Sequence, residues 1–362
     1  MIRRHKDMTI PKKMKAVLKT EPGYDHMSLQ EIDVPEVYGD RVLLKVAYTG
    51  ICGTDIHTFK GEYKNAVTPL VLGHEFSSQV VAVGEDVTKV KVGDRVTSET
   101  TFDTCGECVY CKNKEYNLCE NRSGIGTKAF GSMANYVLTR EESVHILPDN
   151  VSYKLAAMSE PLASCVHAMY QKTPLSLHDK ILIIGPGPMG LLSLQIAKEI
   201  GAFTIVSGTT RDEERLAIAK ELGADIVVNT EKEDLEPIVK QVTDGVGLDI
   251  VYDCSGAIQA VNTALPLLKK GGTLQQVGLF SKDLNAMDQR TIIQHEVNYI
   301  GSRSQNPFDW DIVIHLESKG AINAEKMVTA VYDLEHWRDA FAAMADGKEL
   351  KVLIASNPEE LS

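Results

Sequence analysis

The chain has 362 residues, which predicts two domains, because single hydrophobic cores seldom grow beyond about 250–300 residues. With 38 Lys and Arg against 50 Asp and Glu, the formal net charge of −12 argues against nucleic acids and anionic membranes as main partners, since both require a positive patch. The sequence contains no apolar run near the ~20 residues of a transmembrane helix, so no membrane association is expected.

Residues 14–160 are predicted to be rich in β-strands. Short runs such as "RVLLKVAY" and "SSQVVAVG" are dominated by β-branched or alternating residues, and turns such as "VGDRV" separate them. The end of the chain is mixed helix and strand and closes with "LKVLIAS". We therefore expect one domain to be inserted into the other, with residues 1–161 and 303–362 forming the β-rich domain and residues 162–302 the inserted one.

Four of the seven cysteines lie in one short loop with the spacing C-x2-C-x2-C-x7-C. Four thiolates can enclose one Zn²⁺ tetrahedrally and leave no open position, so we interpret residues 100–122 as a structural zinc lobe. An iron–sulfur cluster and unpaired surface thiols are the alternatives, but the bacterial ferredoxin run has a shorter last gap and a following Pro, where this chain has Glu120. The four cysteines are Cys105, Cys108, Cys111 and Cys119.

The way cysteine is used also indicates the compartment. The seven cysteines are an odd number and are clustered, and the N-terminal segment lacks the apolar region of a signal peptide. This usage is typical of metal binding in a reducing compartment rather than of a disulfide framework. The sequence therefore predicts a cytoplasmic protein.

From residue 180 to 302 the pattern changes to strands that alternate with helices. "KILIIG" and "AFTIVS" are strand-like runs, and "PMGLLSLQIAKEIG" and "RDEERLAIAKELG" are helix-like runs that each end at a glycine. Alternation of this kind predicts an α/β fold with a doubly wound parallel sheet, the Rossmann architecture.

A glycine motif stands between the first strand and the first helix of this region. Gly185, Gly187 and Gly190 have the G-x-G-x-x-G spacing, and the helix opens with Pro188 and Met189. The first glycine makes the tight turn, the second lets the backbone approach a pyrophosphate, and the third permits close packing of helix on sheet. The helix N-terminus would face the phosphates. In this context the motif predicts a dinucleotide site rather than a purely structural turn.

The acidic residue expected about 20 residues further on, which would hold the ribose hydroxyls of NAD, is missing. Ser207, Gly208, Thr209 and Thr210 occupy that stretch, and Arg211 follows. Small hydroxyl residues with a guanidinium suit a 2′-phosphate, because a carboxylate would repel it and Arg can bind it with two hydrogen bonds. The sequence therefore favours NADP(H) over NAD(H). The alternative is that Arg211 only begins the next helix as a solvated charge.

A second, dispersed set of metal-binding residue types precedes the glycine motif. Cys52 lies in "GICGTDIH", His74 and Glu75 in "LGHEF", and Glu160 in "MSEPLASC". A catalytic zinc takes about three protein ligands and keeps one open position, so Cys52, His74 and Glu160 could supply S, N and O donors, with Glu75 as a supporting or exchanging ligand. Taken singly, each has an ordinary structural explanation, since a lone Cys is usually a small buried hydrophobe.

The order of these motifs resembles a known family. "GICGTDIH", "GHE", "VGDRV", the four-cysteine loop, "SEPLA", "GPGPMG" and "LKKGG" follow one another as in zinc-dependent medium-chain dehydrogenases/reductases, over roughly residues 14–355. Glu160 in "SEPLA" and the segment "GSRSQNPFDW" look most like the polyol branch, that of sorbitol (L-iditol) and related dehydrogenases. The four-cysteine loop, which animal sorbitol dehydrogenases lack, is similar to microbial polyol or threonine dehydrogenase-like members.

The resemblance implies a GroES-like catalytic domain, a Rossmann domain, two zinc ions per chain and a homodimer or homotetramer. It implies that Cys52, His74 and either Glu75 or Glu160 hold the catalytic zinc. Thr54 and His57 match the family's hydroxyl–imidazole proton relay. Arg303 matches an arginine near cofactor and substrate, and the loop cysteines match the structural zinc lobe. We expect zinc to activate a secondary hydroxyl of a polyol, or the matching ketose, for hydride transfer with the nicotinamide.

Three alternatives stay open at this stage. A threonine-type amino-alcohol dehydrogenase shares most motifs, but its counterpart of "SEPLA" usually carries Asp. A sugar-phosphate dehydrogenase is neither favoured nor opposed by the two lysines of "KGEYKN", Lys60 and Lys64. A metal-free binding protein of the same fold is opposed by the retention of Cys52, His74 and Glu160.

Overall fold

The computed structural model describes residues 3–4 and 10–357, which fold into two compact units. Within the described part of the chain, unit 1 comprises residues 3–4, 10–160, 305–319 and 324–357, and unit 2 comprises residues 161–304 and 320–323. Unit 1 is β-rich and unit 2 contains a parallel sheet, so the predicted α/β fold class is confirmed. Within the described residues, no helix combines the length and the apolar character needed to cross a bilayer.

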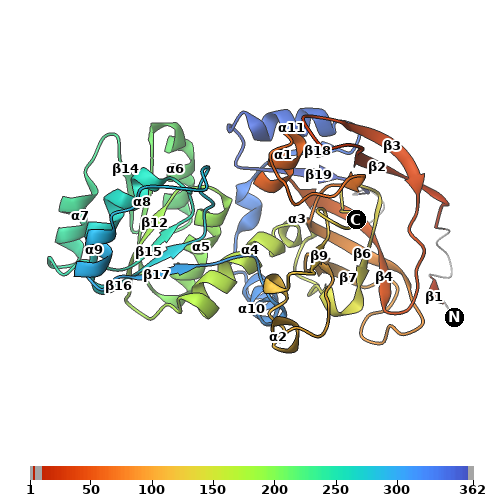
Figure 1. Cartoon of the computed structure of the whole chain (residues 1–362), viewed down its shortest axis with the longest axis horizontal. Coiled ribbons are helices and arrows are strands. Elements are labelled where there is room, and N and C mark those ends of the chain that lie inside the picture. The colour runs from red at the N-terminus through yellow and green to blue at the C-terminus, as the bar shows by residue number, and fades with distance from the viewer. Residues whose placement is uncertain (1–2, 5–9, 358–362) are drawn as a thin grey trace. The chain divides into compact units, whose positions relative to one another are not determined.

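The main sheet of unit 1 is built around two long strands (Figure 1). They contain the run "RVLLKVAY" and, except for its last glycine, the run "SSQVVAVG", both of which the sequence predicted as strands. Neighbouring strands are antiparallel except at one edge, where β18 and β19 are parallel. The order of the main path is β11 (Val144–Ile146), β7 (Arg95–Ser98), β6 (Glu75–Val83), β4 (Arg41–Gly50), β19 (Lys351–Ala355) and β18 (Val328–Asp333), with β10 (Tyr136–Arg140) paired to β4 and β1 (Arg3–Arg4) to β6.

Two smaller sheets and several short helices complete unit 1. One sheet has the order β3 (Met27–Asp33), β2 (Lys13–Lys19) and β5 (Leu70–Val71), and the other pairs β8 (Thr101–Asp103) with β9 (Ser123–Gly124) on either side of the cysteine loop. The helices are α1 (Gly53–Phe59), α2 (Val109–Lys112), α3 (Tyr153–Ala156), α10 (Pro307–Ser318), α11 (Trp337–Ala345) and the start of α4 (Ser159–Val166).

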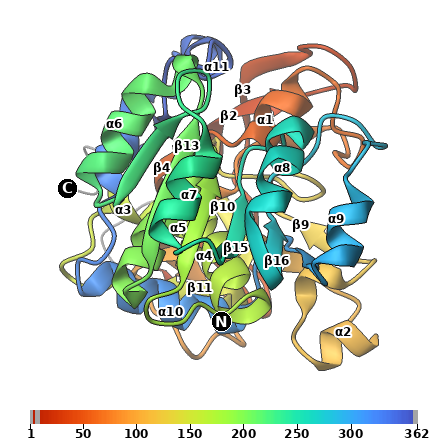
Figure 2. The same cartoon turned by 90° about the vertical axis from the view of Figure 1, so that its left-hand side faces the viewer.

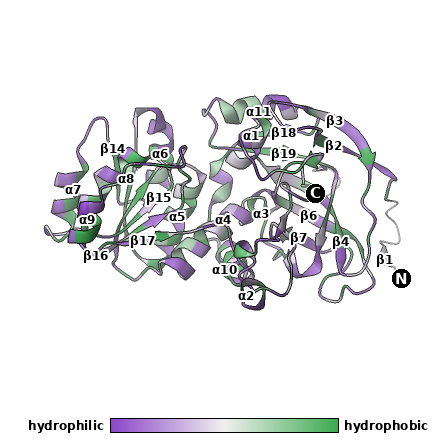
Figure 3. Ribbon diagram, in the orientation of Figure 1, coloured by the Kyte–Doolittle hydropathy of each residue, from purple (hydrophilic) through white to green (hydrophobic). Residues whose placement is uncertain are grey.

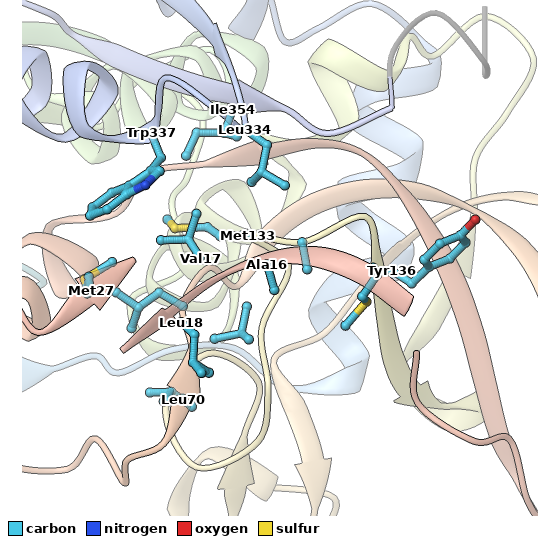
Figure 4. Close-up of a cluster of buried hydrophobic side chains, with 14 of the residues drawn as sticks. Ala16, Val17, Leu18, Met27, Leu70, Met133, Tyr136, Leu334, Trp337 and Ile354 are labelled. Carbon is cyan, nitrogen blue, oxygen red and sulfur yellow. The ribbon is translucent and has the colours of Figure 1, made fainter. Parts of the chain in front are cut away.

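A hydrophobic core lies under strand β2. Ala16, Val17 and Leu18 are buried, and Figure 4 shows them gathered with Met133 and Trp337 from distant parts of the chain. Burying a side chain such as that of Val17 or Leu18 contributes roughly 1.5–3 kcal/mol. This core therefore ties the beginning of the chain to its C-terminal segment, which carries α11 and β19.

Unit 2 has the strand order of a doubly wound dinucleotide-binding fold. Its six strands are all parallel, and the chain order along the sheet is third, second, first, fourth, fifth, sixth. In Figure 2 the strands run between the helices of this unit. The strands are β14 (Ile226–Asn229), β13 (Phe203–Gly208), β12 (Lys180–Ile184), β15 (Leu248–Asp253), β16 (Leu268–Gln276) and β17 (Asn298–Gly301), and the helices are α5 (Pro188–Ile200), α6 (Glu213–Glu221), α7 (Leu235–Val242), α8 (Ile258–Ala264) and α9 (Gln289–Gln294).

Strand β12 explains why this sheet is covered on both faces. Its side chains alternate between the two faces, and both sets are apolar: Leu182 and Ile184 pack in the cluster that includes α7 and α8, while Ile183 faces α5 beside Gly190. Figure 3 shows hydrophobic colour on the strands and hydrophilic stretches on the surrounding helices. Such a continuous apolar run is typical of a buried parallel strand.

Candidate active site

Three metal-binding side chains of unit 1 come together in space. Cys52, His74 and Glu75 each offer a ligand atom, and these atoms lie within 4.8 Å of one another. Cys52 is the N-cap of α1 and is half-buried, whereas His74 and Glu75, at the start of β6, are only 9% and 2% exposed. The fold thus unites two segments that are more than twenty residues apart.

A buried carboxylate joins these two segments. Asp55 lies at the third position of α1, and its Oδ2 accepts a hydrogen bond from the N–H of Cys52 (2.9 Å), while its Oδ1 accepts one from the N–H of Gly73 (3.1 Å). Asp55 Oδ1 also lies 3.8 Å from Nδ1 of His74. Burial raises the pKa of Asp55 above its ordinary value. The sequence prediction missed this residue, although an acid at the third helix position is a known capping signal.

A buried lysine contacts Glu75 from the C-terminal part of the chain. Lys351, the first residue of β19, donates from Nζ to Oε2 of Glu75, and both residues are 2% exposed. Burial opposes the charge on Lys351, but the carboxylate of Glu75 outweighs it and leaves the pKa of Lys351 raised. A Cβ at Gly50 would lie 2.3 Å from Oε2 of Glu75, so glycine leaves the room that this pair occupies. The only sequence signal was a lysine that opens the apolar run "KVLIA".

Glu160 lies near the three-residue cluster but does not belong to it. It is 8% exposed, burial raises its pKa, and its charge acts on His74. The preceding residue, Ser159, donates from Oγ to Oε1 of Glu317 on α10 (2.7 Å). Glu317 is 2% exposed, and burial raises its pKa to about 8. The segment that carries Glu160 is therefore attached to α10 through a second buried carboxyl group.

The chemistry of this set fits a zinc ion that keeps an open position. The donors are a thiol, an imidazole and carboxylates, which are the usual zinc ligands. Nδ1 of His74 is buried and has no hydrogen-bond partner among the residues that the structure describes. Acids also outnumber the nearby cation Lys351, and this excess of negative charge is balanced by a divalent cation.

The four-cysteine loop also forms a compact cluster, and its geometry fits a closed zinc site. The ligand atoms of Cys105, Cys108, Cys111 and Cys119 lie within 4.8 Å of one another, and Sγ of Cys105 is 3.7 Å from Sγ of both Cys111 and Cys119. Four sulfurs placed about 2.3 Å from a tetrahedral centre are about 3.8 Å apart. Backbone N–H groups lower the pKa of Cys105 to about 6, and that of Cys108 has a larger effect than that of Glu107.

The two residues predicted to relay protons lie on α1. Thr54 is half-buried in the first turn, and His57 is exposed in the last. Residues three apart on a helix share one face, so the hydroxyl and the imidazole lie on the same side of α1. Nδ1 of His57 lies 2.7 Å from Oε2 of Glu62 in the following loop.

A pocket in unit 2 lies where strands β12 and β13 end. Its lining includes four residues that the sequence predicted for the cofactor, namely Gly185, Ser207, Gly208 and Thr209. In doubly wound sheets, dinucleotides usually bind in the crevice outside the carboxyl ends of the strands, at the point where the strand order reverses. The remaining lining residues are Ile184, Asp212, Thr230, Leu235, Ser255, Ala257, Ala260 and Thr263.

The glycine motif has the geometry that its spacing predicts. Gly185 has φ +92°, which favours glycine, and a Cβ at Gly190 would lie 2.0 Å from the carbonyl oxygen of Gly185. At Gly187 a Cβ would meet nothing within 4 Å, so the backbone is open to a ligand. Gly187 is the N-cap of α5 and Pro188 has no N–H, so the N–H groups of the first turn that remain available for phosphate begin at Met189.

Three other residues predicted for the cofactor, Thr210 and the two arginines, lie outside this lining. Arg211 and Thr210 are exposed in the turn after β13, and Arg303 is exposed after β17. The sequence prediction missed Asp212, whose Oδ2 accepts hydrogen bonds from the N–H and the hydroxyl of Thr209 (3.0 and 2.8 Å). The pocket therefore contains one carboxylate beside the turn that carries Arg211.

Comparison with known proteins identifies the family. The model of the alcohol dehydrogenase GroES-like domain matches residues 39–149, and the model of the zinc-binding dehydrogenase domain matches residues 188–319. The chain belongs to the zinc-dependent medium-chain dehydrogenase/reductase family. It is thus an NAD(P)-dependent zinc alcohol dehydrogenase, and the alternative of a non-catalytic binding protein is wrong.

Individual relatives confirm the resemblance to the polyol branch. The chain is 64% identical to a D-arabitol-phosphate dehydrogenase of Enterococcus avium, over 96% of this chain and 99% of that protein. It is 45% identical to a sorbitol dehydrogenase of Halalkalibacterium halodurans, over 94% and 99% of the two chains. A zinc-binding dehydrogenase structure from Sinorhizobium meliloti, bound to NADP, has a TM-score of 0.87 at 31% identity and covers 96% of this chain and 100% of its own.

Proposed function

We propose that this dehydrogenase oxidises a secondary hydroxyl group of an acyclic polyol, free or phosphorylated, and reduces the corresponding ketose. The observation that carries the proposal is the mixed cluster of Cys52, His74 and Glu75 in a chain whose relatives at 64% and 45% identity are named as polyol-type dehydrogenases. An open metal site suits a hydroxyl ligand, because one coordination position remains for the substrate.

In this proposal Cys52 and His74 hold the catalytic metal, and either Glu75 or Glu160 completes the protein ligands. Zinc bound there would lower the pKa of the substrate hydroxyl and polarise the ketone in the reverse direction. A nicotinamide bound in unit 2 would supply the hydride acceptor. Asp55 accepts hydrogen bonds from the N–H of Cys52 and from the N–H of Gly73, the residue before His74. It therefore fixes the distance between the two ligands Cys52 and His74.

The chain's own acid–base groups would handle the proton. The hydroxyl of Thr54 accepts the proton from the substrate and passes its own to the imidazole of His57. His57 is exposed on α1 and can release that proton to water. The reverse reaction uses the same groups in the opposite order.

We propose two zinc ions per chain, the second held by the four cysteines of the lobe. Their sulfur spacing fits a closed tetrahedral site, which has no position for a substrate. Elemental analysis of the purified protein tests this number. About two zinc per chain supports the proposal, whereas one or none contradicts it.

The phosphorylated polyol is favoured by one specific observation, the 64% identity to a D-arabitol-phosphate dehydrogenase. A threonine-type activity is opposed by Glu160, since the corresponding residue in those enzymes is usually Asp. Initial rates with a panel of pentitols, hexitols, their phosphates, the matching ketoses and L-threonine separate these substrates. The highest kcat/KM on a polyol or polyol phosphate supports the proposal, and a preference for threonine defeats it.

For the cofactor we propose a preference for NADP(H), with Arg211 as the partner of the 2′-phosphate. Arg211 is exposed next to a pocket lined by the small residues Ser207, Gly208 and Thr209. Asp212 lines the same pocket and is the feature that runs against this preference.

Replacing Arg211 with Ala tests the preference. We expect Arg211→Ala to raise the KM for NADP⁺ about tenfold, because a charge-assisted hydrogen bond is worth roughly 1.5–3 kcal/mol, and to leave the KM for NAD⁺ unchanged. Lys240→Ala, at an exposed position on α7 outside the lining of this pocket, is the control. Equal changes in the KM for NADP⁺ and NAD⁺ would show that Arg211 does not bind the 2′-phosphate.

A homodimer or homotetramer and a cytoplasmic location remain predictions. The seven cysteines are all free thiols in the structure, which is compatible with a reducing compartment. Light scattering coupled to size exclusion gives the oligomer size, and a monomer at micromolar concentration would contradict the predicted assembly.

A further inference from the structure

The loop that follows α1 brings a carboxylate back to His57. Nδ1 of His57 and Oε2 of Glu62 are 2.7 Å apart, and the backbone N–H of Glu62 donates to the carbonyl oxygen of His57 (2.9 Å). The N–H of Tyr63 donates to the same carbonyl group (3.3 Å). Glu62 is therefore bound to His57 through both its backbone and its side chain.

This return depends on a tight turn at Gly61. Gly61 has φ +77°, and a Cβ there would lie 2.6 Å from the backbone of Gly23. The segment that contains Gly23 is itself held by Lys19, which is 2% exposed and donates from Nζ to the carbonyl oxygens of Gly23 (2.6 Å) and Asp25 (2.8 Å). The N–H of Asp25 donates to the carbonyl oxygen of Phe59 at the end of α1 (2.8 Å). Hydrogen bonds anchored on the buried Lys19 thus fix the turn that places Glu62.

We propose that Glu62 is a positioning residue for proton transfer by His57. The inference rests on the proposed function, in which His57 receives the substrate proton through Thr54. An ionised carboxylate can only accept a hydrogen bond, so the 2.7 Å contact requires that the imidazole carries a proton on Nδ1. Nε2 of the neutral ring is then left with the lone pair that accepts the proton.

The proton balance follows from this arrangement. The Nδ1–H bond to Glu62 stays intact throughout the reaction. Nε2 gains one proton from the hydroxyl of Thr54 as that hydroxyl takes one from the substrate, and Nε2 then releases a proton to water. Glu62 stabilises the intermediate imidazolium and keeps the ring oriented, and it neither gains nor loses a proton.

Because His57 and Glu62 are both exposed, a role of their contact in proton transfer can be separated from a role in stability. The side chains of His57 and Glu62 are 60% and 56% exposed, and exposed ion pairs contribute little to folding. The structure offers a matched pair on another segment: Nδ1 of His336 lies 2.6 Å from Oδ1 of Asp333, at 62% and 54% exposure. Breaking the two pairs should have equally small effects on stability and different effects on turnover.

The experiment compares Glu62→Ala, Glu62→Gln, His57→Asn and the double variant with the control Asp333→Asn, on whichever alcohol the wild type oxidises fastest. We expect Glu62→Ala to lower kcat about tenfold at unchanged KM and to raise the solvent deuterium isotope effect on kcat. Glu62→Gln, which keeps an acceptor oxygen, should lose less. Added imidazole should restore part of the rate of Glu62→Ala. The double variant should be no slower than His57→Asn.

Three results would overturn the proposal. Wild-type kcat and isotope effect in Glu62→Ala would show that Glu62 does not act in turnover, whatever His57→Asn does. Losses that add in the double variant would show that Glu62 acts independently of His57. An equal loss in Asp333→Asn would show a general effect of surface charge. The proposed function fails separately, if the wild type oxidises no alcohol or if His57→Asn keeps full activity while Glu62→Ala loses it.

Discussion

The two cysteine-containing clusters of unit 1 are built in opposite ways. The four cysteines of the lobe lie within 15 consecutive residues, and among the described residues Tyr116 alone joins them in a buried cluster. Cys52, His74 and Glu75 come from two separate segments inside a buried environment, with Asp55 and Lys351 attached to them. A closed site can be made by a short loop around its ion, whereas an open site has to be held in shape by the surrounding fold.

This difference predicts how each cluster depends on its metal. The lobe buries little apolar surface, so the metal supplies most of what orders it. The mixed cluster is supported by hydrogen bonds that the backbone N–H groups of Cys52 and Gly73 donate to the carboxylate of Asp55, and neither bond involves a metal ligand atom. Loss of metal should therefore disorder the lobe and leave the mixed cluster folded but inactive.

The largest effect is expected from Cys52→Ser. We expect kcat/KM to fall roughly a thousandfold, because a lost metal ligand removes several kcal/mol of transition-state stabilisation. The circular dichroism spectrum should be unchanged, and bound zinc should fall by one ion per chain. Near-full activity in this variant would mean that the mixed cluster is not the catalytic metal site.

Cys105→Ser should act on structure rather than chemistry. We expect amide hydrogen exchange within the lobe, residues 100–122, to accelerate at least about a hundredfold, because local order there depends on the ion. Exchange in strands β4 and β6 should stay slow. A lobe that remains protected after this substitution and after chelation would show that its own packing holds it.

Lys351→Met tests whether the mixed cluster is supported from outside its ligands. Removing one partner of a buried ion pair leaves the other charge unpaired, so we expect the free energy of unfolding to fall by about 3–5 kcal/mol in urea titrations. Lys15→Met, which breaks the exposed pair with Glu335, is the control and should cause no measurable change. Equal stability of the two variants would mean that Glu75 needs no partner.

Glu317→Gln is expected to have the smallest effect, and the effect depends on pH. The pKa of Glu317 is raised to about 8 from an ordinary 4.5, so the folded protein keeps a proton that the unfolded chain releases between these values. This group therefore makes stability fall with rising pH, by about 1.4 kcal/mol per unit across that window. Glu317→Gln should remove this slope in urea titrations from pH 6 to 8. Asp311→Asn, at an exposed position on α10, should keep it.

The sequence predicted best what is encoded over short distances. The strand–glycine–helix pattern at Gly185 and the alternation of strands and helices predicted the parallel sheet, because backbone geometry at a G-x-G-x-x-G turn depends on residues a few positions apart. The spacing of the loop cysteines predicted a cluster that the structure shows with sulfur separations of 3.7 Å. The family resemblance extended these local patterns to nearly the whole chain.

The contacts of the mixed cluster were beyond such reasoning. No spacing rule links Lys351 to Glu75, which are 276 residues apart, or indicates that Glu317 reaches Ser159. Likewise, the sequence left open whether Glu75 or Glu160 accompanies Cys52 and His74, and the structure groups Glu75 with them.

For this protein, the amino-acid sequence alone was enough to establish the fold class, the dinucleotide turn and the thiol-rich loop, because each depends on neighbours in the chain. Tertiary structure decided which charged groups lie in the core beside the mixed cluster. The reason is energetic: a buried charge is stable only beside a partner, and β-sheet pairing brings that partner from any distance along the chain.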